Sequence, residues 1–151
     1  MIKVNVEINN KSWHKKIKDK KYYFNKKLKK ISQIPKIFKN KNITFTILLT
    51  NSSQMKKLNK KFRNKNKPTD VLSFPNYEKK NLNLAKQKNF YIGDMAISYE
   101  IINSRSLKNN FQSEFDKVWV HGLLHLVGFD HIKNNDYFKM EKLEKRILNL
   151  I

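Results

Sequence analysis

The chain contains no cysteine, and only three glycines and three prolines occur among its 151 residues. Without cysteine it forms no disulfide and offers no thiolate to a metal, so a metal site must use His, Asp or Glu. No apolar run approaches the roughly 20 residues of a transmembrane helix, and the first residues show no signal-peptide core. We therefore expect a cytoplasmic protein without membrane contact, folded as a single domain over residues 1–151.

Acidic residues and arginine are scarce, whereas lysine is abundant. Against 33 Lys and Arg residues stand 12 Asp and Glu residues, which gives a formal net charge of +21. Only Glu7 and Asp19 are acidic before Asp70, so the positive charge is concentrated in the first half of the chain. Such a field attracts polyanions such as nucleic acids. An AT-rich coding sequence yields the same lysine-rich composition without selection for function, and this alternative stays open.

Arg63 is the only arginine in the first 104 residues. Lysine is the usual cation in this region, so a guanidinium here is a distinct choice. A guanidinium presents a planar fork that holds phosphate through two hydrogen bonds, which an ammonium group cannot do. Arg63 is therefore a candidate phosphate-binding residue.

The periodicity of apolar residues indicates the order of secondary structure. Alternating and β-branched residues predict strands at 2–9, 43–49, 71–75 and 90–98. Apolar residues three and four positions apart predict helices at 12–31, from about 52 to 62, from about 98 to 107, from about 113 through the histidine-rich segment, and from about 136 onward. This order predicts an α+β fold, a small mixed sheet covered mainly on one face by several helices.

Local signals add detail to this order. Asn51 with Ser52, Ser98 and Ser113 are the expected N-caps of three of the helices. In the helix that ends near residue 62, the apolar stripe of Met55, Leu58 and Phe62 is expected to face inward.

Three of the four histidines lie within residues 121–131, HGLLHLVGFDH. His121 and His125 are four residues apart and share one face of a helix. Gly128 is placed to end that helix in a left-handed turn, which can bring His131 back toward the first two imidazoles. Three neutral nitrogen ligands with a fourth position left for water are typical of catalytic zinc. The pattern predicts one Zn²⁺ per chain on these three histidines, on a helix and the turn after it.

The same histidine spacing occurs in the metzincin proteases, in which a Glu follows the first His. That Glu serves as the general base. Here the position is Gly122, so a protease would lack its proton acceptor. Phosphodiester cleavage needs charge stabilisation by a metal and a cation instead. The three histidines and Arg63 supply both, which favours a nuclease over a protease.

No residue is assigned as the general base. Asp130 either acts as one or orients a ligand imidazole, which is the more usual role of such a carboxylate. Asp70 and Asp94 are expected to be structural. Ser73 either faces the substrate or bonds to a neighbour within the fold.

Three segments resemble the YbeY family of endoribonucleases. Residues 121–131 match its HGxLHLxGxDH signature, residues 68–75 look like its PTDVLSFP segment, and residues 92–98 look like its LGDIxIS strand. Arg63 falls where the family has its functional arginine, five residues before the proline of the second segment. The resemblance spans about residues 43–148 and continues in outline to the N-terminus.

This resemblance implies a metal-dependent, single-strand-specific endoribonuclease that matures the 3′ end of small-subunit ribosomal RNA and acts in ribosome quality control. Its implied partners are single-stranded RNA, the ribosomal RNA precursor, and the ribosome or its small-subunit proteins. Arg63 and His121 are then the catalytic residues. Phe129, where tyrosine is common in the family, lacks a hydroxyl but leaves the ligands intact. The alternative is a non-catalytic ribosome-assembly factor that holds RNA on its basic face and uses zinc to hold its fold.

Overall fold

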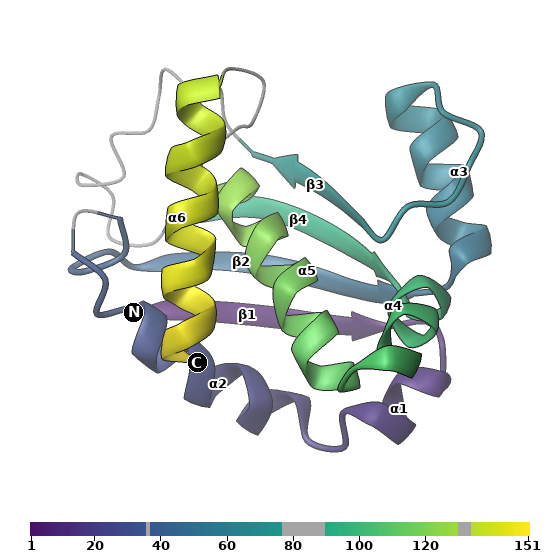
Figure 1. Ribbon diagram of the computed structural model, residues 1–151, viewed down its shortest axis with the longest axis horizontal. Coiled ribbons are helices and arrows are strands. Elements are labelled where there is room, and N and C mark those ends of the chain that lie inside the picture. The colour runs from purple at the N-terminus through teal and green to yellow at the C-terminus, as the bar shows by residue number, and fades with distance from the viewer. Residues whose placement is uncertain (36, 77–89, 130–133) are drawn as a thin grey trace.

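The computed structural model describes residues 1–35, 37–76, 90–129 and 134–151. Its four strands are β1 (Ile2–Ile8), β2 (Ile43–Thr50), β3 (Val71–Pro75) and β4 (Phe90–Ser98), and they form one sheet in the order β1-β2-β4-β3 (Figure 1). β1 and β4 both pair parallel with β2, whereas β3 pairs antiparallel with β4. The predicted mixed sheet is therefore confirmed.

Gly93 allows two neighbouring strands to approach each other closely. Its φ angle is +129°, in the region that only glycine adopts readily. A Cβ atom at this position would lie 2.2 Å from the carbonyl oxygen of Phe74 on β3. The register of β2 on β4 shifts between Thr44 and Phe45, opposite this glycine. The glycine thus accommodates a bulge in β4 beside β3.

The helices are α1 (Ser12–Lys16), α2 (Lys20–Ile31), α3 (Ser52–Arg63), α4 (Tyr99–Arg105), α5 (Phe111–Leu126) and α6 (Asn134–Leu150), and a 3-10 turn, η2 (Ser106–Lys108), follows α4. The single helix expected at 12–31 is wrong, because the chain is extended at Ile17. Asp19 then begins α2 by accepting a hydrogen bond of 2.8 Å from the backbone N–H of Tyr22. An aspartate at this position favours a new helix start over continuation of the previous helix.

Two of the three expected N-cap sites precede helices, and one does not. Asn51 caps α3 through the backbone N–H of Gln54. Ser98 precedes α4, but its hydroxyl lies 2.8 Å from that of a serine in α3 rather than on the backbone of α4. Ser113 is not a cap, because Asn110 accepts hydrogen bonds from the first turn of α5 and starts that helix earlier.

The helices lie on both faces of the sheet, and most lie on one. α5 packs on β3 and β4, α6 packs on α5, and both cross in front of the strands in Figure 1. α3 lies on the opposite face, where its buried Met55 packs against Leu72 and Ala96. Phe62 was expected to face inward with Met55, and this is wrong, because 53% of its surface is exposed.

A buried polar cluster fixes α5 against α2. The carboxylate of Asp116 accepts hydrogen bonds from the Tyr23 hydroxyl at 2.6 Å and from the Trp119 indole at 2.8 Å, and it forms an ion pair with Lys27. Burial and the neighbouring carboxylate raise the pKa of Tyr23 far above its ordinary value, so the phenol stays protonated and donates. The helix that carries the histidines is thereby anchored at its first half.

Candidate metal centre and cleft

His121 and His125 meet on one face of α5. The four-residue spacing places their rings one turn apart, with centroids 4.7 Å from each other. Their Nε2 atoms lie 3.1 Å apart. Both side chains are partly buried, so the two nitrogens converge at the surface of the helix and not in the core.

The other nitrogen of each ring faces an oxygen acceptor. Nδ1 of His121 lies 3.1 Å from a carboxylate oxygen of Glu144, and Nδ1 of His125 lies 3.0 Å from the carbonyl oxygen of Phe129. A carboxylate and a carbonyl both accept, so each neutral imidazole donates from Nδ1 and directs its Nε2 lone pair toward the other ring. Acceptors of this kind commonly orient metal-binding histidines.

Gly128 produces the turn that positions the second of these acceptors. Its φ angle is +91°, its N–H donates to the carbonyl of His125, and the N–H of Phe129 donates to the carbonyl of Leu124, each at 3.0 Å. This pair of bonds is a Schellman motif, which ends α5 in a left-handed residue as predicted. The turn brings the Phe129 carbonyl back onto the imidazole of His125.

The geometry of His121 and His125 fits a zinc-type ion. The two Nε2 lone pairs face each other across 3.1 Å. They repel each other unless a cation lies between them and accepts both, so this arrangement is favourable in a metal site. In tetrahedral zinc, with Zn–N bonds of about 2.0–2.1 Å, two ligand nitrogens lie about 3.3 Å apart. Within the part of the chain that the structure describes, no group of three His, Cys, Asp or Glu side chains is arranged for a metal. The predicted third ligand, His131, lies outside the described residues, as does Asp130.

These histidines open onto a cleft of about 1030 Å³. Its walls come from the end of α3 and the segment after it, from β3, and from α5 and α6. Among the described residues that line it are five cations: Arg63, Lys65, Lys67, Arg105 and Lys117. The two acids among these described lining residues, Asp70 and Glu144, bond to Arg105 and His121. The cleft is therefore electropositive, which favours a polyanionic ligand.

Arg63 lies in the same cleft as the histidines. It is exposed, and its Nη2 donates a hydrogen bond of 3.1 Å to the carbonyl of Ser73 on β3. The Ser73 hydroxyl in turn donates to the carbonyl of Gly122, at 3.2 Å. Ser73 thus bonds to a neighbour within the fold, which was one of its two expected roles. These bonds connect the arginine through β3 to the residue after His121.

Gly122 faces the sheet rather than the cleft. A Cβ atom there would lie 3.1 Å from the Met95 sulfur, 3.1 Å from Val71 Cγ2 and 3.2 Å from the Ser73 hydroxyl. This is the position at which metzincins carry their glutamate. The site lacks that carboxylate, and a side chain here would require these three neighbours to shift, so the geometry supports the argument against a protease.

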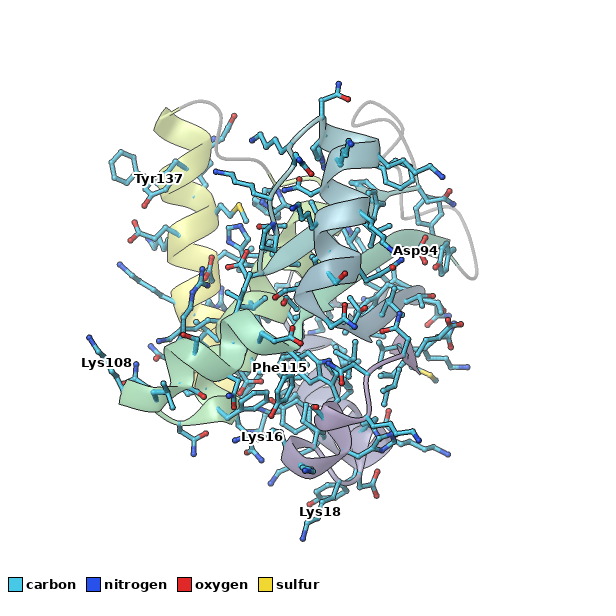
Figure 2. All side chains as sticks on the ribbon, turned by 90° about the vertical axis from the view of Figure 1, so that its right-hand side faces the viewer. Lys16, Lys18, Asp94, Lys108, Phe115 and Tyr137 are labelled. Atoms are coloured by element: carbon cyan, nitrogen blue, oxygen red, sulfur yellow. The ribbon has the colours of Figure 1, made fainter. Side chains whose placement is uncertain are left out.

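Asp70 and Asp94 each have local partners. Asp70 accepts from Arg105 at 2.5 Å and from the Val71 N–H at 2.8 Å, and although burial raises its pKa, these bonds hold the pKa of Asp70 below its ordinary value. Asp94 accepts from the Tyr91 hydroxyl at 2.5 Å. Figure 2 shows Asp94 on the side of the sheet away from α5 and α6, and therefore away from the histidines.

Two groups that contact the histidines were not identified from the sequence, the Glu144 carboxylate and the Phe129 carbonyl. Glu144 comes from α6, where it borders the buried stripe that contains Met140 and Ile147, so a helical projection of that segment would direct it toward a neighbouring helix. The Phe129 carbonyl belongs to the backbone and carries no sequence signal of its own. The remaining histidine, His14, is exposed on α1 and lies 3.0 Å from Lys20 Nζ, outside the cleft lining.

Comparison with known proteins places this arrangement in a family. The family model described as endoribonuclease YbeY matches residues 7–151. The chain belongs to the YbeY endoribonuclease family. A relative named Endoribonuclease YbeY from Pelagibacter ubique (strain HTCC1062) is 48% identical over 157 residues, which cover 100% of this chain and 97% of that protein. Another of the same name, from Buchnera aphidicola, is 40% identical over 134 residues, covering 85% and 79% of the two chains.

A solved structure shares the fold. The solution structure of TM1509 from Thermotoga maritima superposes with a TM-score of 0.61 and 26% sequence identity. The match covers 99% of this chain and 87% of that one. The resemblance to the YbeY family indicated by the three motifs is confirmed by the family model over residues 7–151 and by the relatives of that name. Within the described residues, no helix is both long and apolar enough to cross a membrane.

Proposed function

We propose that this protein is a zinc-dependent endoribonuclease that cleaves single-stranded RNA in the cytoplasm. The observation that carries the proposal is the convergence of His121 and His125, whose Nε2 atoms lie 3.1 Å apart in the same cleft as Arg63. Membership in a family of endoribonucleases supports RNA as the substrate. The electropositive lining of the cleft suits a polyanionic strand.

His121, His125 and His131 would hold the zinc ion. When bound, such an ion acidifies water and stabilises the negative charge that develops on a phosphate under attack. Glu144 and the Phe129 carbonyl keep the two described imidazoles oriented, with Nδ1 protonated and Nε2 available as a ligand atom.

Arg63 would bind the scissile phosphate. Its guanidinium is exposed in the cleft, and one of its nitrogens is tied to the Ser73 carbonyl, which restricts its position. The remaining N–H groups can donate to phosphate oxygens as a fork. A fixed cation on the phosphate stabilises the charge that accumulates there during cleavage.

We assign the ribosomal RNA precursor as substrate, with cleavage at the 3′ end of the small-subunit RNA and the ribosome or its small-subunit proteins as partners. Family membership supports an RNA substrate, and the cationic cleft suits a polyanion of this kind. A cleft of this kind binds RNA without reading its sequence, so choice of the cleavage site falls to the partner.

The proposal is tested by cleavage of a labelled single-stranded RNA that carries one 2′-deoxy nucleotide. The wild type, His125→Ala and His14→Ala are purified in parallel, and zinc is measured on the same samples. We expect the wild type and His14→Ala to cut the RNA and His125→Ala to lose both zinc and cleavage. Loss of cutting only at the deoxy position assigns the attack to the 2′-hydroxyl, and unchanged cutting assigns it to water.

Equal cleavage and equal zinc in wild type and His125→Ala would overturn the proposal. Zinc-loaded wild type that binds RNA and does not cut it, with or without small ribosomal subunits, would favour the non-catalytic assembly factor. Salt dependence cannot separate the two functions, because both predict binding that weakens steeply with salt.

A further inference from the structure

Phe62 is a large apolar side chain exposed at the end of α3. The Phe62 side chain is 53% exposed, although the apolar pattern of the helix predicts that it faces inward. The ring does not stand alone: it makes an edge-to-face contact with Phe74 of β3, with centroids 5.1 Å apart and planes inclined by 65°. An aromatic ring held by a second ring keeps its orientation while leaving a face available to solvent.

The aromatic pair lies across β3 from the histidines. Ser73 and Phe74 are consecutive in a strand, so their side chains point to opposite faces of the sheet. The Ser73 hydroxyl bonds to Gly122 of α5, whereas Phe74 packs with the apolar cluster under α3. Within the described residues, β3 is an edge strand of the sheet, and Arg63 donates a hydrogen bond to the Ser73 carbonyl of this strand. The guanidinium thus lies between the aromatic pair and the histidines.

The surroundings of Phe62 are cationic. Residues 60–67 contain five lysines and arginines and no acid. Lys61 Nζ lies 5.3 Å from the centroid of the Phe62 ring. A single exposed ring among cations is a poor surface for an apolar protein partner, since such interfaces exclude charge from their centre. It suits an unpaired nucleobase, which stacks on the ring while its phosphates contact the cations.

We propose that Phe62, supported by Phe74, is a base-stacking subsite for the RNA strand. This inference rests on the proposed function and extends it. One unpaired base stacks on Phe62, and a neighbouring phosphate lies at Arg63, on the path to the histidines. A base inside a duplex is already stacked and paired, so it does not reach this ring. The subsite therefore supplies a physical basis for preferring single-stranded RNA.

The first experiment uses tryptophan fluorescence as a direct reporter of stacking. The two native tryptophans, Trp13 and Trp119, are fully buried, so Phe62→Trp introduces a uniquely exposed indole. The matched control is Tyr22→Trp, an exposed aromatic position among the lysines of α2; neither Tyr22 nor Phe62 lines the cleft, but Phe62 directly precedes Arg63, which does. Each variant is titrated with a single-stranded RNA decamer, with an abasic strand of the same length and charge, and with an acidic peptide.

We expect the RNA decamer to quench the fluorescence of Phe62→Trp, and the abasic strand to leave it unchanged. Tyr22→Trp should respond to neither. Equal quenching at both positions, or equal quenching of Phe62→Trp by the abasic strand, would overturn the subsite in favour of a general electrostatic effect. Quenching by an acidic peptide but not by RNA would overturn it in favour of a protein partner.

A second measurement uses the affinity for RNA. Phe62→Leu should weaken binding of the decamer about tenfold and leave zinc content unchanged, whereas Tyr22→Leu should bind as tightly as the wild type. The same affinity for Phe62→Leu and wild type would overturn the subsite. These outcomes can be distinguished from those that test the proposed function. Base-dependent quenching without cleavage would show that the protein binds RNA by stacking but is not a nuclease. Cleavage without quenching would show that it is a nuclease without this subsite.

Discussion

The carboxylate of Glu144 lies 3.1 Å from Nδ1 of His121, although 23 residues separate them in the chain. The packing of α6 on α5 brings them together. A carboxylate in this position holds the imidazole in one tautomer and raises its basicity as a ligand. Within the motif, this role was one of the two alternatives for Asp130, which lies outside the described residues.

Glu144→Gln should lower the affinity for zinc about 10- to 100-fold. Glutamine preserves the size of the side chain but removes the negative charge that strengthens the histidine as a ligand. The measurement is zinc competition with a chromophoric chelator. Glu141→Gln is the matched control, because its carboxylate is on the same helix and pairs with Lys145 at 2.8 Å instead. Equal zinc affinity in Glu144→Gln and Glu141→Gln would contradict the orienting role.

Arg63→Lys should reduce the rate of RNA cleavage about 10- to 100-fold, since lysine keeps the charge but loses the fork that engages phosphate. The hydrogen bond to the Ser73 carbonyl should also weaken. Single-turnover rates on the labelled RNA measure the effect, with zinc content recorded. Arg146→Lys, at an exposed position of α6 outside the cleft lining, should cleave at the wild-type rate. If both variants cleave equally fast, Arg63 has no role on the phosphate.

Structural features that depend on residues close together in the chain, such as strand alternation and helix faces, could be predicted from the sequence. The alternation in β2 leaves Ile43, Phe45 and Ile47 buried, as the pattern requires. The spacing of His121 and His125 fixes their common helix face. Errors arose where two local signals competed. Asp19 interrupts an apolar stripe that continues through α1 and α2, and the stripe alone does not show where one helix ends.

Features set by contacts between distant segments could not be predicted. Glu144 reaches His121 from another helix, and Arg63 reaches Ser73 across the edge of a strand. Phe62 is exposed because of where α3 ends relative to β3. The sequence around Phe62 does not predict that relative position. Helical periodicity places Phe62 on the apolar side of α3 but does not say how far the underlying sheet extends.

Gly128→Ala should lower the free energy of unfolding by about 1 kcal/mol, because an L-residue at φ of +91° brings its Cβ close to the following carbonyl. The variant should also weaken the bond between the Phe129 carbonyl and His125. Urea denaturation measures the change. Gly128→Asn should recover part of the loss, since asparagine tolerates the left-handed region best among the other residues. Equal stability of glycine and alanine here would mean that the turn relaxes without strain.

Asp70→Asn should lower the free energy of unfolding by about 1 kcal/mol at neutral pH. The folded-state pKa of Asp70 is held below its ordinary value by Arg105 and the Val71 N–H, against the opposing effect of burial. Its contribution is therefore fully present above the unfolded pKa of about 3.9 and is lost as the pH falls through the folded pKa. The difference between wild type and Asp70→Asn, measured by denaturation from pH 7 to pH 2, should shrink across that acidic range. Glu7→Gln, at an exposed position of β1, should differ little from wild type throughout. A difference for Asp70→Asn that is independent of pH would show that the loss comes from packing rather than from the charged hydrogen bonds.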